Sequence, residues 1–109
     1  PNVYQTEKEY ERDMERMKEL YPRRMKELLA YVEEECDKME YEGSLMFDVF
    51  PDKIALQLMA AGIAGEFTKK YPDSYPEEGR LLRDMIEVVL YHEIMYRRNR
   101  YRNHKRLYL

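Results

Sequence analysis

The sequence predicts an all-α fold: a three-to-four-helix bundle with a long kinked N-terminal helix, an apolar central helix and a long C-terminal helix ending in a basic tail. Three observations predict it. Only four Gly and five Pro occur in 109 residues, which leaves few turns for a sheet of many short strands. The chain is 44% hydrophobic and 38% charged, a mixture that favours a helical globule. Its apolar residues recur three and four positions apart, as on one face of a helix. We expect one domain, residues 1–109.

The first helix is expected over residues 7–41. Thr6 and Glu9 have the spacing of a capping box at its start, and Gly43 is a natural left-handed stop after its end. The apolar stripe keeps its phase across Pro22, although proline removes a helical hydrogen bond. Either one helix bends there, or two nearly collinear helices meet with Pro22 at the start of the second. The stripe comprises Tyr10, Met14, Met17, Tyr21, Met25, Leu28, Val32, Cys36 and Met39.

The connector after this helix, residues 44–50, is short and apolar. Its composition would suit a strand, but no partner strand is found elsewhere in the sequence. A buried connector or a single helical turn is therefore expected, in which Asp48 must find hydrogen-bond donors.

The central helix is predicted around residues 54–65, a stretch with no charge in which Gln57 is the only polar side chain. A helix that is apolar on every side is typical of a buried element. Pro51 and Asp52 suit its first turn, and the two lysines at 69–70 suit its end. We expect the first and last helices to sandwich it.

The last helix should follow a turn segment at residues 71–76, where Ser74 has the position of a cap and Glu77 comes three residues later. It is expected to persist to about Arg100 and then fray. Residues 97–109 form a basic tail with six bases and no acid, whereas all 22 acids precede it. One broad face should pack inward, formed by Leu81, Leu82, Met85, Ile86, Val88, Val89, His92, Met95 and Tyr96.

The basic tail carries the candidate functional residues. Its cations alternate with tyrosines, a combination that suits a phosphate backbone or single-stranded bases. Alternatively, the same side chains continue the last helix and pair with acids of this chain or a partner, such as Glu33, Glu34, Glu35 and Asp37. The residues predicted to contact nucleic acid or a partner are Arg97, Arg98, Arg100, Tyr101, Arg102, Lys105 and Arg106.

No pattern predicts a catalytic, cofactor-binding or metal site, and we expect no enzyme. His92 and His104 lie twelve positions apart and lack the spacing of H-E-x-x-H or of the Glu-x-x-His pairs of di-iron bundles. His92 is interpreted as an interior or boundary residue. Cys36 lies on the first apolar stripe beside acids, which oppose thiolate formation, so it is expected in the core.

These observations predict a protein–protein interaction or regulatory module that acts through a helical face. The first apolar stripe leaves surface that a second copy could cover, so the expected partner is another protein or the chain itself. The alternative is a nucleic-acid-binding accessory protein that uses the basic tail.

A cytoplasmic protein without a membrane span is expected. The single cysteine favours a reducing compartment, and no apolar signal region is found at the N-terminus. The longest run without a charge is the twelve residues 54–65, whereas about 20 are needed to cross a bilayer.

Three runs in the first half of the chain are distinctive: YPRRMKELL from Tyr21, EEECDKMEYEGS from Glu33 and FPDK from Phe50. Together they resemble small hypothetical proteins of anaerobic Gram-positive bacteria. The resemblance covers about a third of the chain. It implies a bacterial cytoplasmic origin and implies no activity, cofactor or site.

Overall fold

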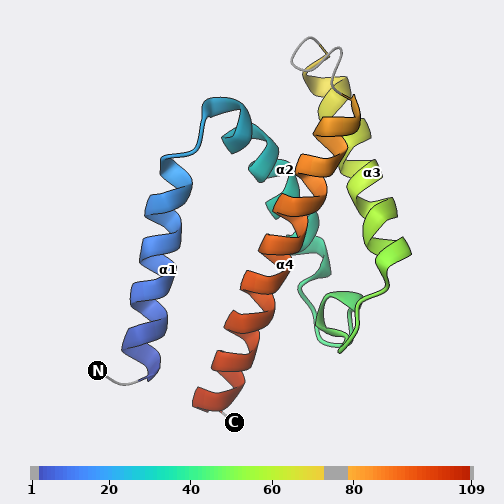
Figure 1. Ribbon diagram of the computed structural model, residues 1–109. Coiled ribbons are helices and arrows are strands. Elements are labelled where there is room, and N and C mark those ends of the chain that lie inside the picture. Colours follow the sequence, from blue (N-terminus) through green and yellow to red (C-terminus); the bar gives the residue numbers. More distant parts are fainter. Residues whose placement is uncertain (1–2, 73–78, 109) are drawn as a thin grey trace.

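The computed structural model describes residues 3–72 and 79–108, with side chains for 5–72 and 79–105. Within these residues the chain forms α-helices, one short 3-10 turn and no strand, so the predicted all-α fold is confirmed. The start of the first helix and the end of the last lie at the same end of the bundle (Figure 1). In chain order the elements are α1 (Val3–Glu19), α2 (Arg23–Met39), η1 (Leu45–Phe47), α3 (Lys53–Lys70) and α4 (Gly79–Tyr108).

The predicted first helix is two helices, and they are not collinear. Pro22 is the N-cap of α2, with a non-helical ψ of 148°. Its ring disfavours the helical conformation in Tyr21, the residue before it, so α1 ends ahead of the proline. The chain then reverses, so that α1 rises and α2 descends in Figure 1. Lys18 Nζ consequently lies 3.3 Å from Glu33 Oε1, whereas collinear helices would separate these residues by about 22 Å. Because α1 already begins at Val3, Thr6 lies inside the helix and does not cap it.

The connector between α2 and α3 begins at the expected glycine. Gly43 has a φ of 88°, in the region where residues with a side chain are strained. The Ser44 hydroxyl then accepts a hydrogen bond from Met46 N at 3.1 Å and caps η1. The connector is thus a single helical turn, one of the two forms predicted, and it buries Met46 completely. The side chain of Asp48 is exposed, so it needs no enclosed donors.

Helix α3 has the predicted ends but not the predicted place. Asp52 caps it by accepting a hydrogen bond from Ala55 N at 3.2 Å, and the helix ends at Lys70. We expected neighbours on every side, but α3 lies at an edge of the bundle and packs mainly against α4 and α2 (Figure 1). Ile63 is buried while Leu58 is 69% exposed. One side of this apolar helix therefore faces the core and the other is free.

The central element is α4 instead. It packs against α1, α2, α3 and η1. Its 30 residues give it a length of about 45 Å, close to the 48 Å long dimension of the molecule. The helix continues to Tyr108, so the basic segment that was expected to fray after Arg100 is helical. The predicted cap residues Ser74 and Glu77 lie outside the described residues.

The core lies between α2, α3 and α4, and within the described residues α1 supplies none of its buried members. Leu90 and Ile94 of α4 point inward although the predicted apolar face omits them. Val88 and Met95 belong to that predicted face but are exposed, because the neighbours of α4 cover only part of its broad apolar surface. The core residues are Leu28, Val32, Cys36, Met46, Ala60, Ile63, Ala64, Phe67, Leu82, Ile86, Leu90 and Ile94.

Candidate functional site

Arg97 lies at the centre of a partly buried charge cluster that joins α2 to α4. Its side chain is 6% exposed and donates through Nη1 to Asp37 at 2.7 Å and to Glu40 at 3.3 Å, both at the end of α2. Its Nε donates to Glu93 at 3.1 Å, one turn earlier on α4. A further hydrogen bond reaches the carbonyl oxygen of Glu33 at 3.3 Å. The alternative prediction, that the tail pairs with acids of the same chain, therefore describes the contacts of this residue.

Lys18 extends the cluster to α1. Its Nζ lies 3.3 Å from Glu33, 3.5 Å from Glu93 and 3.9 Å from Glu15. Burial acts to lower the pKa of Lys18, but the three carboxylates outweigh it, so the pKa is raised above 10.5. Burial likewise opposes the charge on Arg97, and the hydrogen bonds that it donates to Asp37 and Glu93 raise that pKa as well. Glu93 is only 5% exposed, so its charge depends on these two cations.

Arg98 and Tyr101 have a different role, because both hold η1 against α4. Arg98 is buried, and its Nη1 donates to the carbonyl oxygens of Met46 at 2.7 Å and Asp48 at 2.5 Å. The ring of Tyr101 stacks on Phe47 with centroids 4.4 Å apart. These two predicted contact residues are therefore engaged within the chain.

The other predicted contact residues are nearer the surface. Arg100 is partly exposed and donates to Glu40 at 2.6 Å. Lys105 lies 3.8 Å from a carboxylate of the segment between α2 and η1. Arg102 is exposed, and the side chain of Arg106 lies outside the described residues. The structure thus distributes the six predicted residues with described side chains along α4 and does not bring these six together on one free surface.

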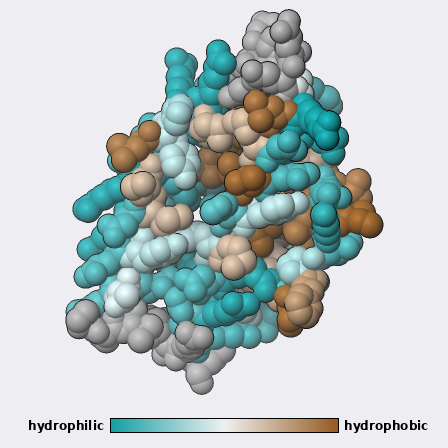
Figure 2. Space-filling model, viewed as in Figure 1, coloured by the Kyte–Doolittle hydropathy of each residue, from teal (hydrophilic) through white to brown (hydrophobic). Residues whose placement is uncertain are grey.

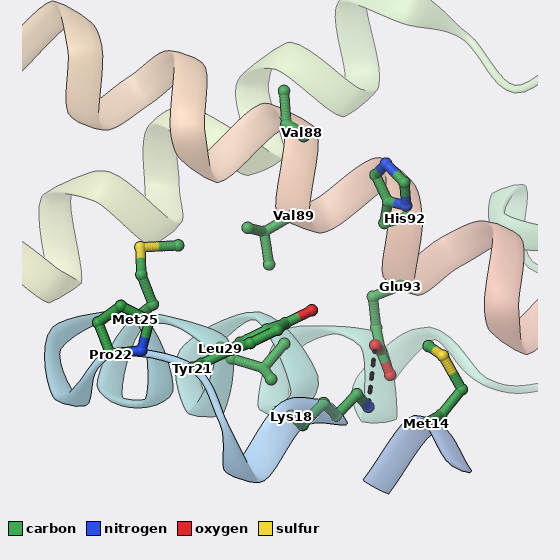
Figure 3. A pocket seen from close by; sticks show the side chains of 10 residues that line it. All are labelled: Met14, Lys18, Tyr21, Pro22, Met25, Leu29, Val88, Val89, His92 and Glu93. Atoms are coloured by element: carbon green, nitrogen blue, oxygen red, sulfur yellow. Dashed lines mark hydrogen bonds and ion pairs between the residues drawn. The ribbon is translucent and has the colours of Figure 1, made fainter. Parts of the chain in front are cut away.

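A pocket of about 340 Å³ lies between α1, α2 and α4 (Figure 3). The ring of Tyr21 lies across it, Val89 points into it, and the Lys18–Glu93 ion pair closes one end. His92, interpreted from the sequence as an interior or boundary residue, is exposed at this pocket. The described residues of its wall include no hydroxyl of Ser or Thr and no thiol, so the pocket offers a place for binding more than for nucleophilic chemistry. The lining residues are Met14, Lys18, Tyr21, Pro22, Met25, Leu29, Val88, Val89, His92 and Glu93.

Four strongly exposed apolar side chains lie at and just before the start of α3. Val49 is 79% exposed, Phe50 89%, Ile54 66% and Leu58 69%. Hydrophobic surface accordingly follows the right edge of Figure 2, over α3 and the segment that precedes it. Ile54 and Leu58 lie one turn apart on the side turned away from the core, and two glycines continue the same stripe. We define the outer α3 face as Val49, Phe50, Ile54, Leu58, Gly62 and Gly65.

The two glycines of the outer α3 face have no packing role within the part of the chain that the structure describes. Gly62 and Gly65 are both exposed, and a Cβ added at either position would meet no atom within 4 Å. Each nevertheless weakens the helix by about 1 kcal/mol relative to Ala. The face therefore carries two unfavourable residues that leave the helix backbone bare toward solvent.

Sequence reasoning missed the outer α3 face because it treated all of residues 54–65 as buried. A signal for it was present. Positions 54, 58, 62 and 65 fall on one helical stripe, while Ala60, Ile63 and Phe67 fall on the opposite one. The first stripe combines large side chains with glycines, and the second carries the residues that the structure buries.

Other classes of site find little support. Among the described residues, no group of three or more His, Cys, Asp or Glu is placed to hold a metal ion. Over the same ranges, no helix combines the length and the apolar character needed to cross a membrane. The chain matches no protein-family model, no curated protein and no solved structure. Functional inference therefore rests on the surfaces described above.

Proposed function

We propose that the protein is a protein–protein interaction module that binds its partner through the outer α3 face. The observation that supports this most is the exposure of Ile54 and Leu58, at 66% and 69%, on a helix whose opposite side is buried in the core. Contiguous exposed apolar surface marks interaction sites in soluble proteins. Phe67 and Ile63 anchor α3 from behind, so the face is presented by a rigid element.

The charge cluster supports the same function indirectly. Arg97 joins α2 to α4, and Arg98 fixes the connector that leads into α3. These contacts determine where α3 begins relative to the rest of the bundle. The cations of the tail thereby act as structural residues that position the binding helix.

The alternative, a nucleic-acid-binding accessory protein, has less support from these contacts. Arg97 and Arg98 would have to leave buried partners before they reached a phosphate, which is costly. Ion pairs at the surface are weak. The side chains that remain for contacts with phosphate are those of Arg100, Lys105 and the exposed Arg102. Three such contacts would give a slope of log K on log salt of about −2 to −3.

We further propose the cytoplasm of a bacterium as the location. The only cysteine, Cys36, is free and buried, which agrees with a reducing compartment. The resemblance of the α2 segment to small bacterial proteins agrees with it as well. Cell fractionation with an antibody to the chain tests this, and recovery in a membrane or extracellular fraction would contradict it.

Photo-cross-linking in the native cell tests the proposed interaction. A benzophenone amino acid in place of Leu58 should produce species heavier than the 13.4 kDa chain. The same substitution at Arg12, an exposed residue of α1, should produce none. If Leu58 yields no cross-linked species while the protein remains helical by circular dichroism, the proposal is wrong. Retention on single-stranded RNA that survives Leu58→Lys and is lost on Arg102→Ala would favour the alternative.

A further inference from the structure

The outer α3 face is complementary to itself in shape. Its N-terminal half carries the large side chains of Ile54 and Leu58, and its C-terminal half carries Gly62 and Gly65. Two copies packed antiparallel would place the large half of each against the small half of the other. A parallel pair would place large against large and glycine against glycine, with a gap between the glycines.

In one antiparallel register, each large side chain lies opposite a glycine of the other copy. If a two-fold axis passes level with Ala60, Leu58 lies two positions before it and Gly62 two positions after it. Leu58 of one copy is then directly opposite Gly62 of the other. Ile54 and Gly65 lie six and five positions from the axis, a mismatch of only about 1.5 Å in height. Each large side chain therefore fills the space above a glycine.

The charged ends of α3 come level with each other in this register. Lys69 continues the outer stripe, and its side chain is 79% exposed beside Glu66 at 3.7 Å. Asp52 is exposed at the opposite end of the helix. These residues lie nine and eight positions from the axis, so Lys69 of one copy comes level with Asp52 of the other, although Asp52 lies about 100° around the helix from Lys69 and off the outer face. The two helix dipoles are also opposed, whereas a parallel pair would bring like charges together.

We propose that a second copy of this chain binds antiparallel across the outer α3 face and forms a two-fold symmetric dimer, with its axis at the height of Ala60 along the helix. This inference rests on the proposed function, because it names the partner of the same face. It explains Gly62 and Gly65, since only residues without a side chain let two helix backbones approach closely. It also explains the exposure of Ile54 and Leu58, because a symmetric interface uses each of these contacts twice.

Sedimentation velocity at a series of concentrations tests the dimer. The wild-type chain should reach twice its 13.4 kDa mass at high concentration and dissociate on dilution. Leu58→Lys removes two buried leucines per dimer and adds two charges, so the dissociation constant should rise about 100-fold or more. The matched control is Met95→Lys, which changes an apolar side chain of α4 that is 59% exposed. It should leave the dissociation constant unchanged.

A second variant separates loss of the dimer from loss of folding. Gly62→Leu introduces its Cβ where no atom of the described residues lies within 4 Å, and leucine favours a helix more than glycine does. The monomer should therefore remain folded, as circular dichroism would show. The new side chain would nevertheless keep the two helices apart and should raise the dissociation constant by a similar factor. A dimer that persists in Gly62→Leu contradicts the proposed contact.

The other outcomes are equally distinct. A chain that stays at 13.4 kDa at every concentration while the Leu58 position cross-links to a different protein overturns self-association and leaves the proposed function standing. A chain that neither self-associates nor cross-links overturns both. A dimer that is lost on Met95→Lys but kept on Leu58→Lys places the interface on α4 and overturns this assignment.

Discussion

Replacing Arg97 with methionine tests whether the basic end of the chain is structural. Arg97 Nε donates to Glu93 at 3.1 Å, and both side chains are almost fully buried. The replacement leaves the Glu93 carboxylate beside Lys18 Nζ at 3.5 Å, without its closer cation. Removing one member of a buried ion pair costs about 3–5 kcal/mol, because the other charge is left uncompensated.

The loss should fall near the lower end of that range. Lys18 retains part of the compensation, and methionine fills much of the space that the arginine stem occupied. Asp37 is 69% exposed and Glu40 31%, so the bonds to these two residues add at most about 1 kcal/mol each. We therefore expect Arg97→Met to lower the free energy of unfolding by about 3 kcal/mol. That is a large share of the roughly 5–15 kcal/mol typical of a domain.

Urea unfolding followed by far-ultraviolet circular dichroism measures this loss. The control is Arg102→Met, which removes an exposed cation of the same helix and should change stability by no more than about 0.5 kcal/mol. Adding Glu93→Gln to Arg97→Met should recover part of the loss, because the unpaired buried charge is then gone. Unfolding of Arg97→Met and Arg102→Met at the same urea concentration would show that the buried contacts of Arg97 do not stabilise the fold.

The Cys36 thiol should resist iodoacetamide at pH 8 until urea unfolds the chain, as mass spectrometry would show, because burial raises its pKa from 9.0 to about 12. The folded state holds this proton more tightly than the unfolded state, so the thiol stabilises the fold below about pH 9 and loses that contribution as pH rises toward 12. Rapid alkylation of the folded chain would contradict this. Gly43→Ala should lower the free energy of unfolding by about 1–2 kcal/mol, because φ is 88° at that position; an unchanged urea midpoint would show that the turn is not strained. Amides of α1 should exchange hydrogen faster than those of residues 82–97. Because α1 supplies no described core residue, it should open at a lower free energy. Equal protection of the amides in both segments would contradict this expectation.

Features that depend on a few neighbouring residues were predictable from the sequence. Asp52 and Lys70 mark the ends of α3, and Gly43 marks the turn after α2. Cys36 is in the core, as its place on the apolar stripe indicates. Each of these outcomes is decided by dihedral angles, caps or periodicity within about one helical turn.

The arrangement of the helices was not predictable in the same way. Apolar periodicity shows which residues share a face, but it does not determine the angle between α1 and α2 at Pro22. Contacts such as that of Lys18 with Glu33, 15 positions away, accompany the reversal. Apolar character around residues 54–65 was equally ambiguous, because a helix with one side in the core and one side free for a partner has the same composition as a fully buried helix.

The candidate site was predictable only in part. Six cations after residue 96 and the acids of α2 indicated that pairing within the chain was one of two possibilities. Which cations pair depends on contacts between residues 57 to 64 positions apart, such as those of Arg97 with Glu40 and Glu33. Local pattern does not contain that information. Nor does it show that Arg102 remains exposed while Arg98 is buried.

The distance between spin labels on two copies shows whether the outer α3 faces pair antiparallel. Thr68 is exposed beside the outer stripe of α3, eight positions from the proposed axis, so labels on Thr68→Cys should lie roughly 24 Å apart along the helices. The buried Cys36 stays unlabelled under native conditions. With the width of the helix pair included, the antiparallel dimer should give a dipolar distance of about 25–35 Å at high protein concentration. A much shorter distance would indicate a parallel pair, and the absence of coupling at any concentration would show that no second copy covers this face.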